Sequence, residues 1–160
     1  MLTLGIDCGI TRANPAGIAL VETDPLSLVG AHTFVAGAGE WDERLYVFSQ
    51  YLADLIRKLK PALISYEYPH LERNPQTLIK LAHVGGVVIA SGAAHGLPVV
   101  KVHPSQAKTA LAGSPTATKR DMIRAVETIF RQRLPKDAAD ALGVALAGEA
   151  IYRRAALTAR

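Results

Sequence analysis

The chain has 160 residues, of which 49% are hydrophobic and 20% are charged. These values predict one globular domain over residues 1–160 and exclude long disordered segments. The sequence contains one cysteine, which excludes an intramolecular disulfide and, without a signal-peptide pattern, favours a cytoplasmic location. We find no apolar run near the roughly 18–20 residues that a membrane helix needs, so we expect no membrane partner.

The charge is unevenly distributed along the chain. Residues 1–100 contain 7 Lys and Arg against 9 Asp and Glu, whereas residues 101–160 contain 11 against 5. Such an asymmetry indicates a polyanionic partner, such as a nucleic acid. A solvated basic surface that binds nothing anionic explains the same counts, and the charge alone does not decide between the two.

The spacing of apolar residues divides the chain into strands and helices. The predicted strands cover residues 1–8, 17–22, 28–35, 62–68 and 97–102. The predicted helices cover residues 40–60, 74–94, 105–112, 118–133 and 136–154. The first three strands suit an antiparallel meander, and the later strands alternate with helices. This order predicts the α/β class, with a five-stranded mixed sheet of antiparallel and parallel strands flanked by helices.

Four acidic residues lie in unusual surroundings. Asp7 and Glu67 each lie near the end of an apolar strand, where a charge needs a cation or hydrogen-bond partners. Asp137 and Asp140 are three residues apart in a predicted helix and therefore face the same side. In one cluster, these carboxylates would repel one another unless divalent cations neutralised them. Oxygen ligands favour Mg²⁺ or Mn²⁺, and two such ions can cleave a phosphodiester.

Each of these acids also has an ordinary structural explanation. Asp7 could be a turn residue, and Glu67 could pair with Arg73. Asp137 could cap a helix, and Asp140 could be a favourable charge in its first turn. The residue types alone leave both interpretations open.

Four motifs, in order along the chain, resemble those of the RuvC family of Holliday-junction resolvases. Residues 5–9, Gly-Ile-Asp-Cys-Gly, resemble its first-strand motif, with cysteine where the family usually has proline. Residues 65–67, Ser-Tyr-Glu, resemble the strand that carries its glutamate. Residues 105–113, followed by Lys119, and residues 137–145 are similar to its two remaining motifs. Together the motifs cover nearly the whole chain at the family's spacing.

The resemblance implies an RNase H-like fold and a Mg²⁺-dependent endonuclease of DNA recombination and repair. Such an enzyme works as a homodimer on four-way DNA junctions, cuts two strands symmetrically and leaves 5′-phosphate ends. A branch-migration helicase is a further candidate partner. The implied catalytic residues, which would bind two Mg²⁺ with Mn²⁺ as a substitute, are Asp7, Glu67, Asp137 and Asp140. Lys108 and Lys119 become candidates for phosphate contact or for stabilising transition-state charge.

Several residues are candidates for DNA contact. In well-studied relatives an aromatic wedge follows the glutamate by three residues, but here that position holds His70, which stacks on a base less well. Tyr68 or Leu71 could take its place. The predicted DNA-binding residues are His70, Tyr68, Arg73, Lys108, Lys119, Arg120 and Arg124. The helix at 74–94, rich in small residues, is the candidate dimer interface, although its glycines could equally pack on the protein's own sheet.

Three other hypotheses remain. Another RNase H-like nuclease, acting on ribosomal RNA precursors or on flaps and forks, would share the early aspartate and the glutamate. A non-enzymatic nucleic-acid binder is disfavoured because all four carboxylates are intact. A sugar-kinase or actin-like ATPase would need two such domains, and 160 residues provide one.

Overall fold

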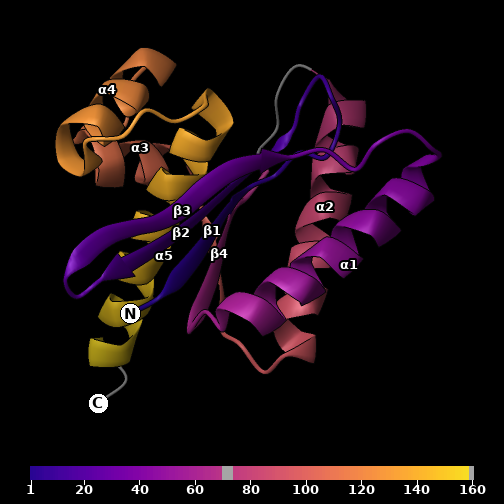
Figure 1. Cartoon of the computed structure of the whole chain (residues 1–160), viewed down its shortest axis with the longest axis horizontal. Coiled ribbons are helices and arrows are strands. Elements are labelled where there is room, and N and C mark those ends of the chain that lie inside the picture. The colour runs from indigo at the N-terminus through magenta and orange to yellow at the C-terminus, as the bar shows by residue number, and fades with distance from the viewer. Residues whose placement is uncertain (70–73, 159–160) are drawn as a thin grey trace.

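A mixed sheet forms the centre of the protein (Figure 1), whose computed structural model describes residues 1–69 and 74–158. The strands are β1 (Thr3–Asp7), β2 (Ala16–Thr23), β3 (Leu26–Phe34), β4 (Leu63–Glu67) and β5 (Val99–Val102). The helices are α1 (Trp41–Leu59), α2 (Pro75–Ala94), α3 (Pro104–Ala112), α4 (Lys119–Phe130) and α5 (Lys136–Thr158). Figure 1 shows α1 and α2 on one side of the sheet and α3, α4 and α5 on the other.

The strand order is β3-β2-β1-β4-β5. β1, β2 and β3 pair antiparallel, whereas β4 pairs parallel with both β1 and β5. Parallel neighbours need a crossover: α2 connects β4 to β5, and the connection from β1 to β4 passes through β2, β3 and α1. The predicted α/β class and the five-stranded mixed sheet are therefore confirmed.

Each face of the sheet carries its own apolar core. On one face, Leu4 and Ile6 of β1 pack with Phe48 of α1 and Val88 of α2. Cys8 belongs to the same core, as strand alternation predicts. Burial of large apolar side chains contributes about 2 kcal/mol each, so this core holds α1 and α2 on the sheet. The core on the opposite face is built largely from α5, whose buried side chains include Leu142.

Helix α5 lies unusually close to the sheet because the sheet residues beneath it are small. A Cβ added to Gly5 would lie 2.2 Å from the Ala141 carbonyl oxygen. A Cβ at Gly17 would lie only 1.8 Å from the Asp137 carbonyl oxygen. Only glycine permits these approaches, so the two glycines fix the position of the first turns of α5 along the sheet.

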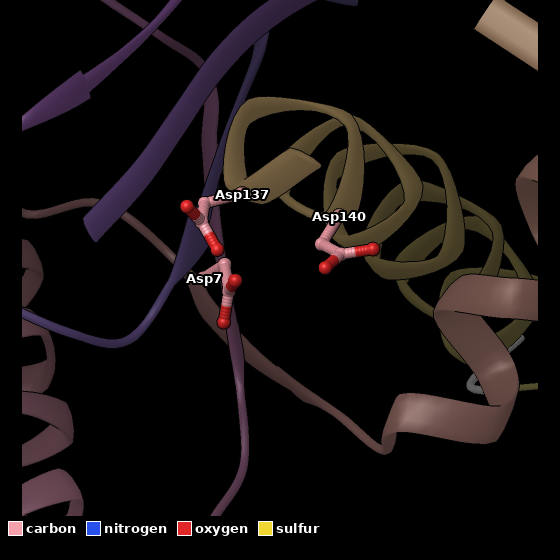
Figure 2. A group of neighbouring side chains, drawn as sticks. All are labelled: Asp7, Asp137 and Asp140. Atoms are coloured by element: carbon pink, nitrogen blue, oxygen red, sulfur yellow. The ribbon is translucent and has the colours of Figure 1, made fainter. Parts of the chain in front are cut away.

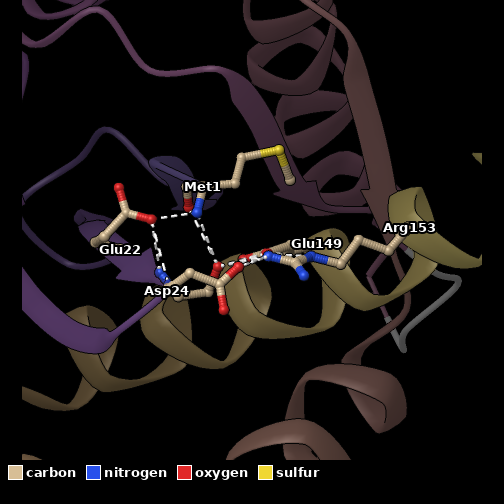
Figure 3. Close-up of polar contacts among 6 residues, drawn as sticks. Met1, Glu22, Asp24, Glu149 and Arg153 are labelled. Carbon is tan, nitrogen blue, oxygen red and sulfur yellow. Dashed lines mark hydrogen bonds and ion pairs between the residues drawn. The ribbon is translucent and has the colours of Figure 1, made fainter.

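The other end of α5 is tied to the β2–β3 turn by polar groups (Figure 3). Glu149 is buried, and its Oε1 accepts hydrogen bonds from Thr23 Oγ1 at 2.5 Å and Arg153 Nε at 2.6 Å. Arg153 also donates to Asp24 Oδ2 at 2.5 Å. The α-amino group of Met1 contacts the Glu22 carboxylate beside them. These contacts anchor the late turns of α5 to the hairpin.

The structure corrects two predicted helix ends. α4 ends at Phe130 and not at residue 133, because Arg131 adopts a left-handed backbone with φ of 57°. α5 continues past residue 154 to Thr158. Both predictions relied on apolar spacing, which carries little information about the exposed last turn of a helix.

The expectation that no segment is long and apolar enough to cross a membrane is wrong for α2. Its 20 residues reach a mean hydropathy of 1.5 because Val, Leu, Ile and Ala together dominate the segment. The segment contains no long run of large apolar side chains, which is why the sequence pattern did not single it out. In this fold α2 contacts α1, β4 and β5.

Candidate active site

Three carboxylates meet where β1 ends beside the first turns of α5 (Figure 2). One oxygen from each of Asp7, Asp137 and Asp140 lies within 4.8 Å of the other two. Asp137 is buried, whereas Asp7 and Asp140 are partly buried. Gly17 pairs with Asp7 across β1 and β2, and its missing side chain admits the Asp137 backbone. The small residues of the sheet therefore bring the helical pair to the strand acid.

Glu67 joins this group from β4. β1 and β4 are parallel neighbours with Ile6 opposite Tyr66, so Asp7 and Glu67 follow at the same edge of the sheet. Glu67 lines the same cavity as the three aspartates. The structure thus brings together all four acids that the sequence singled out.

The electrostatics of the cluster are unfavourable without an added cation. Burial raises the pKa of Asp7 well above its ordinary value, and the charges of Glu67, Asp140 and Asp137 raise it further. Burial also raises the pKa of Asp140, although Lys119 and Lys108 oppose that shift. At an effective dielectric of about 20, two carboxylates at this separation repel by roughly 3 kcal/mol. The site is therefore built to receive positive charge.

Two lysines border the acids. Lys119 begins α4, whose first turn is closed by a capping box between Thr118 and Asp121. Its Nζ lies 3.7 Å from Asp140 Oδ2, with 64% of the lysine side chain exposed. So exposed an ion pair contributes at most about 1 kcal/mol, which leaves the ammonium available to another anion. Lys108 of α3 lines the same cavity.

The cavity has a volume of about 530 Å³ and contains residues that sequence reasoning did not assign to the site. These additional lining residues are Cys8, Asn14, Thr77, Leu81, Pro104, Ala107 and Met122. Asn14 lies in the turn after β1, where proximity to Asp7 in the sequence could have indicated it. The others come from separate helices or from the core, and only the tertiary packing brings them to this wall.

The donor set fits a divalent metal ion. The three clustered ligands are carboxylate oxygens, which are typical ligands of hard divalent cations. Cys8 touches the cavity but is 6% exposed and belongs to the apolar core, so it serves packing as expected. The arrangement can therefore hold metal ions and a phosphate between acids and lysines.

Three of the remaining DNA-contact candidates, Tyr68, Arg120 and Arg124, are described by the structure and do not line this cavity. Tyr68 is 48% exposed, and Lys101 Nζ lies 5.5 Å from its ring centroid. Arg120 and Arg124 are exposed on α4 and do not line the cavity. Two further candidates, His70 and Arg73, lie outside the described residues, as does Leu71.

The small residues of α2 lie in two different surroundings. A Cβ at Gly92 would lie 2.2 Å from Val99 Cγ2, and one at Gly85 would lie 3.2 Å from the Tyr66 ring. These two glycines therefore pack on the protein's own sheet. Gly86 has nothing within 4 Å, and Ile89 beyond it is 47% exposed.

Comparison with known proteins gives consistent matches. A family model described as crossover junction endodeoxyribonuclease RuvC matches residues 3–148. The RuvC protein of Paenarthrobacter aurescens is 34% identical over 148 residues, covering 89% of this chain and 78% of that protein. The RuvC protein of Syntrophomonas wolfei is 35% identical over 157 residues, covering 96% and 91%.

The solved structures agree with these matches. Thermus thermophilus RuvC superposes with a TM-score of 0.80 at 26% identity, covering 98% of this chain and 97% of that one. The same protein in complex with a Holliday junction substrate gives a TM-score of 0.81 at 24% identity, covering 97% and 96%. The similarity confirms the RNase H-like fold expected from the sequence.

Proposed function

Because this chain belongs to the RuvC family of crossover junction endodeoxyribonucleases, we propose that it resolves four-way (Holliday) DNA junctions in recombination and repair. Residues 1–160 act as one nuclease domain. The observation that carries the proposal is the cluster of Asp7, Asp137 and Asp140, with Glu67 on the same cavity wall. Carboxylates at this spacing are what metal-dependent cleavage of a phosphodiester requires.

The proposed metal-binding catalytic residues are Asp7, Glu67, Asp137 and Asp140. They hold two Mg²⁺, for which Mn²⁺ can substitute, because their ligand atoms are oxygens. Divalent ions held by these residues would supply an acidified water and positive charge for the phosphate and the leaving oxygen. The raised pKa of Asp7 supports this assignment, since its causes are burial and the neighbouring acids.

The two lysines position the scissile phosphate. Lys119 exchanges its exposed contact with Asp140 for a phosphate oxygen, and Lys108 approaches from α3. Water adds to phosphorus as the bond to the 3′ oxygen breaks, which leaves a 5′-phosphate and a 3′-hydroxyl. Met122 and Leu81 add apolar surface to the cavity wall.

Surfaces outside the cavity bind the rest of the junction. Tyr68, with His70 and Arg73 after it, contacts bases near the branch point, and Arg120 and Arg124 contact backbone phosphates. This assignment rests on the exposure of Tyr68, Arg120 and Arg124.

Two symmetric cuts require two active sites, so the protein acts as a homodimer. Helix α2 is the proposed interface, because Ile79 and Ile89 are 48% and 47% exposed and Gly86 admits close approach. A branch-migration helicase is the proposed partner, and the cytoplasm, where the DNA lies, is the proposed location.

The test incubates purified protein and Mg²⁺ with labelled DNA substrates. A mobile four-way junction is compared with a flap, a fork, a plain duplex and an RNA–DNA hybrid. The proposal predicts paired symmetric nicks confined to the junction. Equal cutting of the duplex or the hybrid contradicts it, and preferential cutting of RNA or of flaps supports the alternative nuclease functions.

Two variants make the test specific to the cluster. Asp7→Asn is expected to abolish cleavage yet retain junction binding, because it removes negative charge from a phosphate-binding surface. Asp54→Asn on the exposed face of α1 loses one surface ion pair and is expected to cut like the wild type. Wild-type cleavage by the Asp7 variant would contradict the proposed mechanism.

A further inference from the structure

A second hollow adjoins the cavity that contains the acids and lies beside α1 and α2. It has a volume of about 180 Å³, and Thr11, Trp41 and Lys80 are among its lining residues. Asn14, Thr77 and Leu81 line both this hollow and the cavity that contains the acids. A strand placed on the acidic cluster therefore has a continuous path past Asn14 and Thr77 to Lys80.

The ammonium group of Lys80 is held in place by an aromatic ring. Its Nζ lies 5.5 Å from the Trp41 ring centroid, within the range of a cation–π contact. Trp41 packs partly on the core, and its Nε1 donates to His83 Nδ1 at 3.0 Å, which fixes the ring. Within residues 1–69 and 74–158, Lys80 forms no ion pair with a carboxylate. Among these residues, only the Trp41 ring positions the ammonium group of Lys80.

The opposite wall of this hollow is a closed turn. Thr11 N donates to Asn14 O at 3.0 Å, and Asn14 N donates to Thr11 O at 3.2 Å and to Thr11 Oγ1 at 3.1 Å. These bonds use the backbone of Asn14 and leave its exposed side-chain amide for a ligand. The amide, the Thr77 hydroxyl and the Lys80 ammonium are all hydrogen-bond donors. Donors of these types are the ones that proteins use for backbone phosphates.

We propose that Lys80, Asn14 and Thr77 form a second phosphate subsite, which binds a phosphate of the cut strand that flanks the scissile one. This inference rests on the proposed function and specifies how the site fixes the strand. Lys108 and Lys119 approach the acids from α3 and α4, whereas Lys80 approaches from α2. Cations on both sides of the acids fix the path of the strand and thereby its polarity.

The experiment combines Lys80→Ala with neutral phosphates in the DNA. Junctions carry a single methylphosphonate at each position within three nucleotides of the cut, and binding is measured without metal. Lys80→Ala is expected to weaken binding of the unmodified junction about five- to tenfold and to reduce the salt slope by about one. At the position that Lys80 contacts, the methylphosphonate is expected to weaken binding by the wild type. The Lys80 variant is expected to bind the modified and the unmodified junction equally at that position.

The matched control is Lys58→Ala, which removes an exposed lysine from the last turn of α1. It is expected to leave the position dependence of the wild type unchanged. Trp41→Ala is expected to abolish the position-specific effect of the methylphosphonate, as Lys80→Ala does. Trp41→Phe is expected to retain that effect, because phenylalanine keeps a ring face for the ammonium. Thermal melting of each variant verifies that it is folded.

Two results would overturn the subsite. Either Lys80→Ala binds like the wild type, or every methylphosphonate affects the wild type and the variant equally. The proposed function fails separately, when the wild type with Mg²⁺ makes no cut in a junction. A wild type that cuts, together with a Lys80 variant that lacks a position-specific effect, refutes the subsite alone.

Discussion

The two ends of α5 treat their acidic residues in opposite ways. At the late end, Oε1 of buried Glu149 accepts hydrogen bonds from Thr23 and Arg153, so the fold supplies a cationic partner for this carboxylate (Figure 3). At the early end, Asp137 and Asp140 lie against a third carboxylate (Figure 2), and Lys119 forms only an exposed ion pair with Asp140. The contrast indicates that Glu149 stabilises the fold through a cation of the same chain, whereas the aspartate cluster needs a cation from solution.

The largest expected effect comes from removing a charge at the early end. Asp137→Asn should reduce junction cleavage at least about a thousandfold, since bound metal supplies several kcal/mol of transition-state stabilisation. The single-turnover rate with Mg²⁺ measures the change. A loss smaller than tenfold would show that Asp137 is not part of the metal site.

A smaller effect is expected from a substitution that displaces Asp137 and leaves its carboxylate unchanged. Gly17→Ala places a Cβ where the Asp137 carbonyl oxygen lies, so the start of α5 must shift. A misplacement of about 1 Å should cost roughly a hundredfold in cleavage rate. Gly30→Ala on β3 is the control, because nothing lies within 4 Å of its added Cβ. Equal rates for the two folded variants would contradict the positioning role of Gly17.

A further prediction concerns pH. Burial raises the folded-state pKa of Asp7 and of Asp140, so their contribution to stability is present at low pH and is lost as pH rises through the raised values. Mg²⁺ binds the charged forms and should restore that loss. The rise in melting temperature on adding Mg²⁺ should therefore grow as the pH is raised above the ordinary pKa of aspartate. A shift that is constant or falls with pH would contradict this view of the cluster.

The sequence predicted the strand part of the site well. Strand alternation puts Asp7 on the face opposite Leu4 and Ile6, and those two residues pack in the core on the other side. The parallel register that brings Glu67 beside Asp7 follows from the mixed sheet. Local periodicity was sufficient because a strand has only two faces.

The parts that the sequence did not predict depend on contacts between distant elements. Gly17 resembles any strand glycine until the Asp137 backbone is seen against it. The Trp41 ring packs partly on the core, but it also lines the second hollow and holds Lys80. No spacing within α1 or α2 contains that information, because the contact joins two helices.

The most direct test of the contrast between the two ends is metal-free thermal melting of two variants at about pH 8. Asp7→Asn should melt a few degrees above the wild type because it relieves carboxylate repulsion, and saturating Mg²⁺ should remove that advantage. Glu149→Gln should melt several degrees below the wild type, since it breaks the charged hydrogen bond from Arg153. Changes of opposite sign support the account. A metal-free Asp7 variant that melts below the wild type would contradict it.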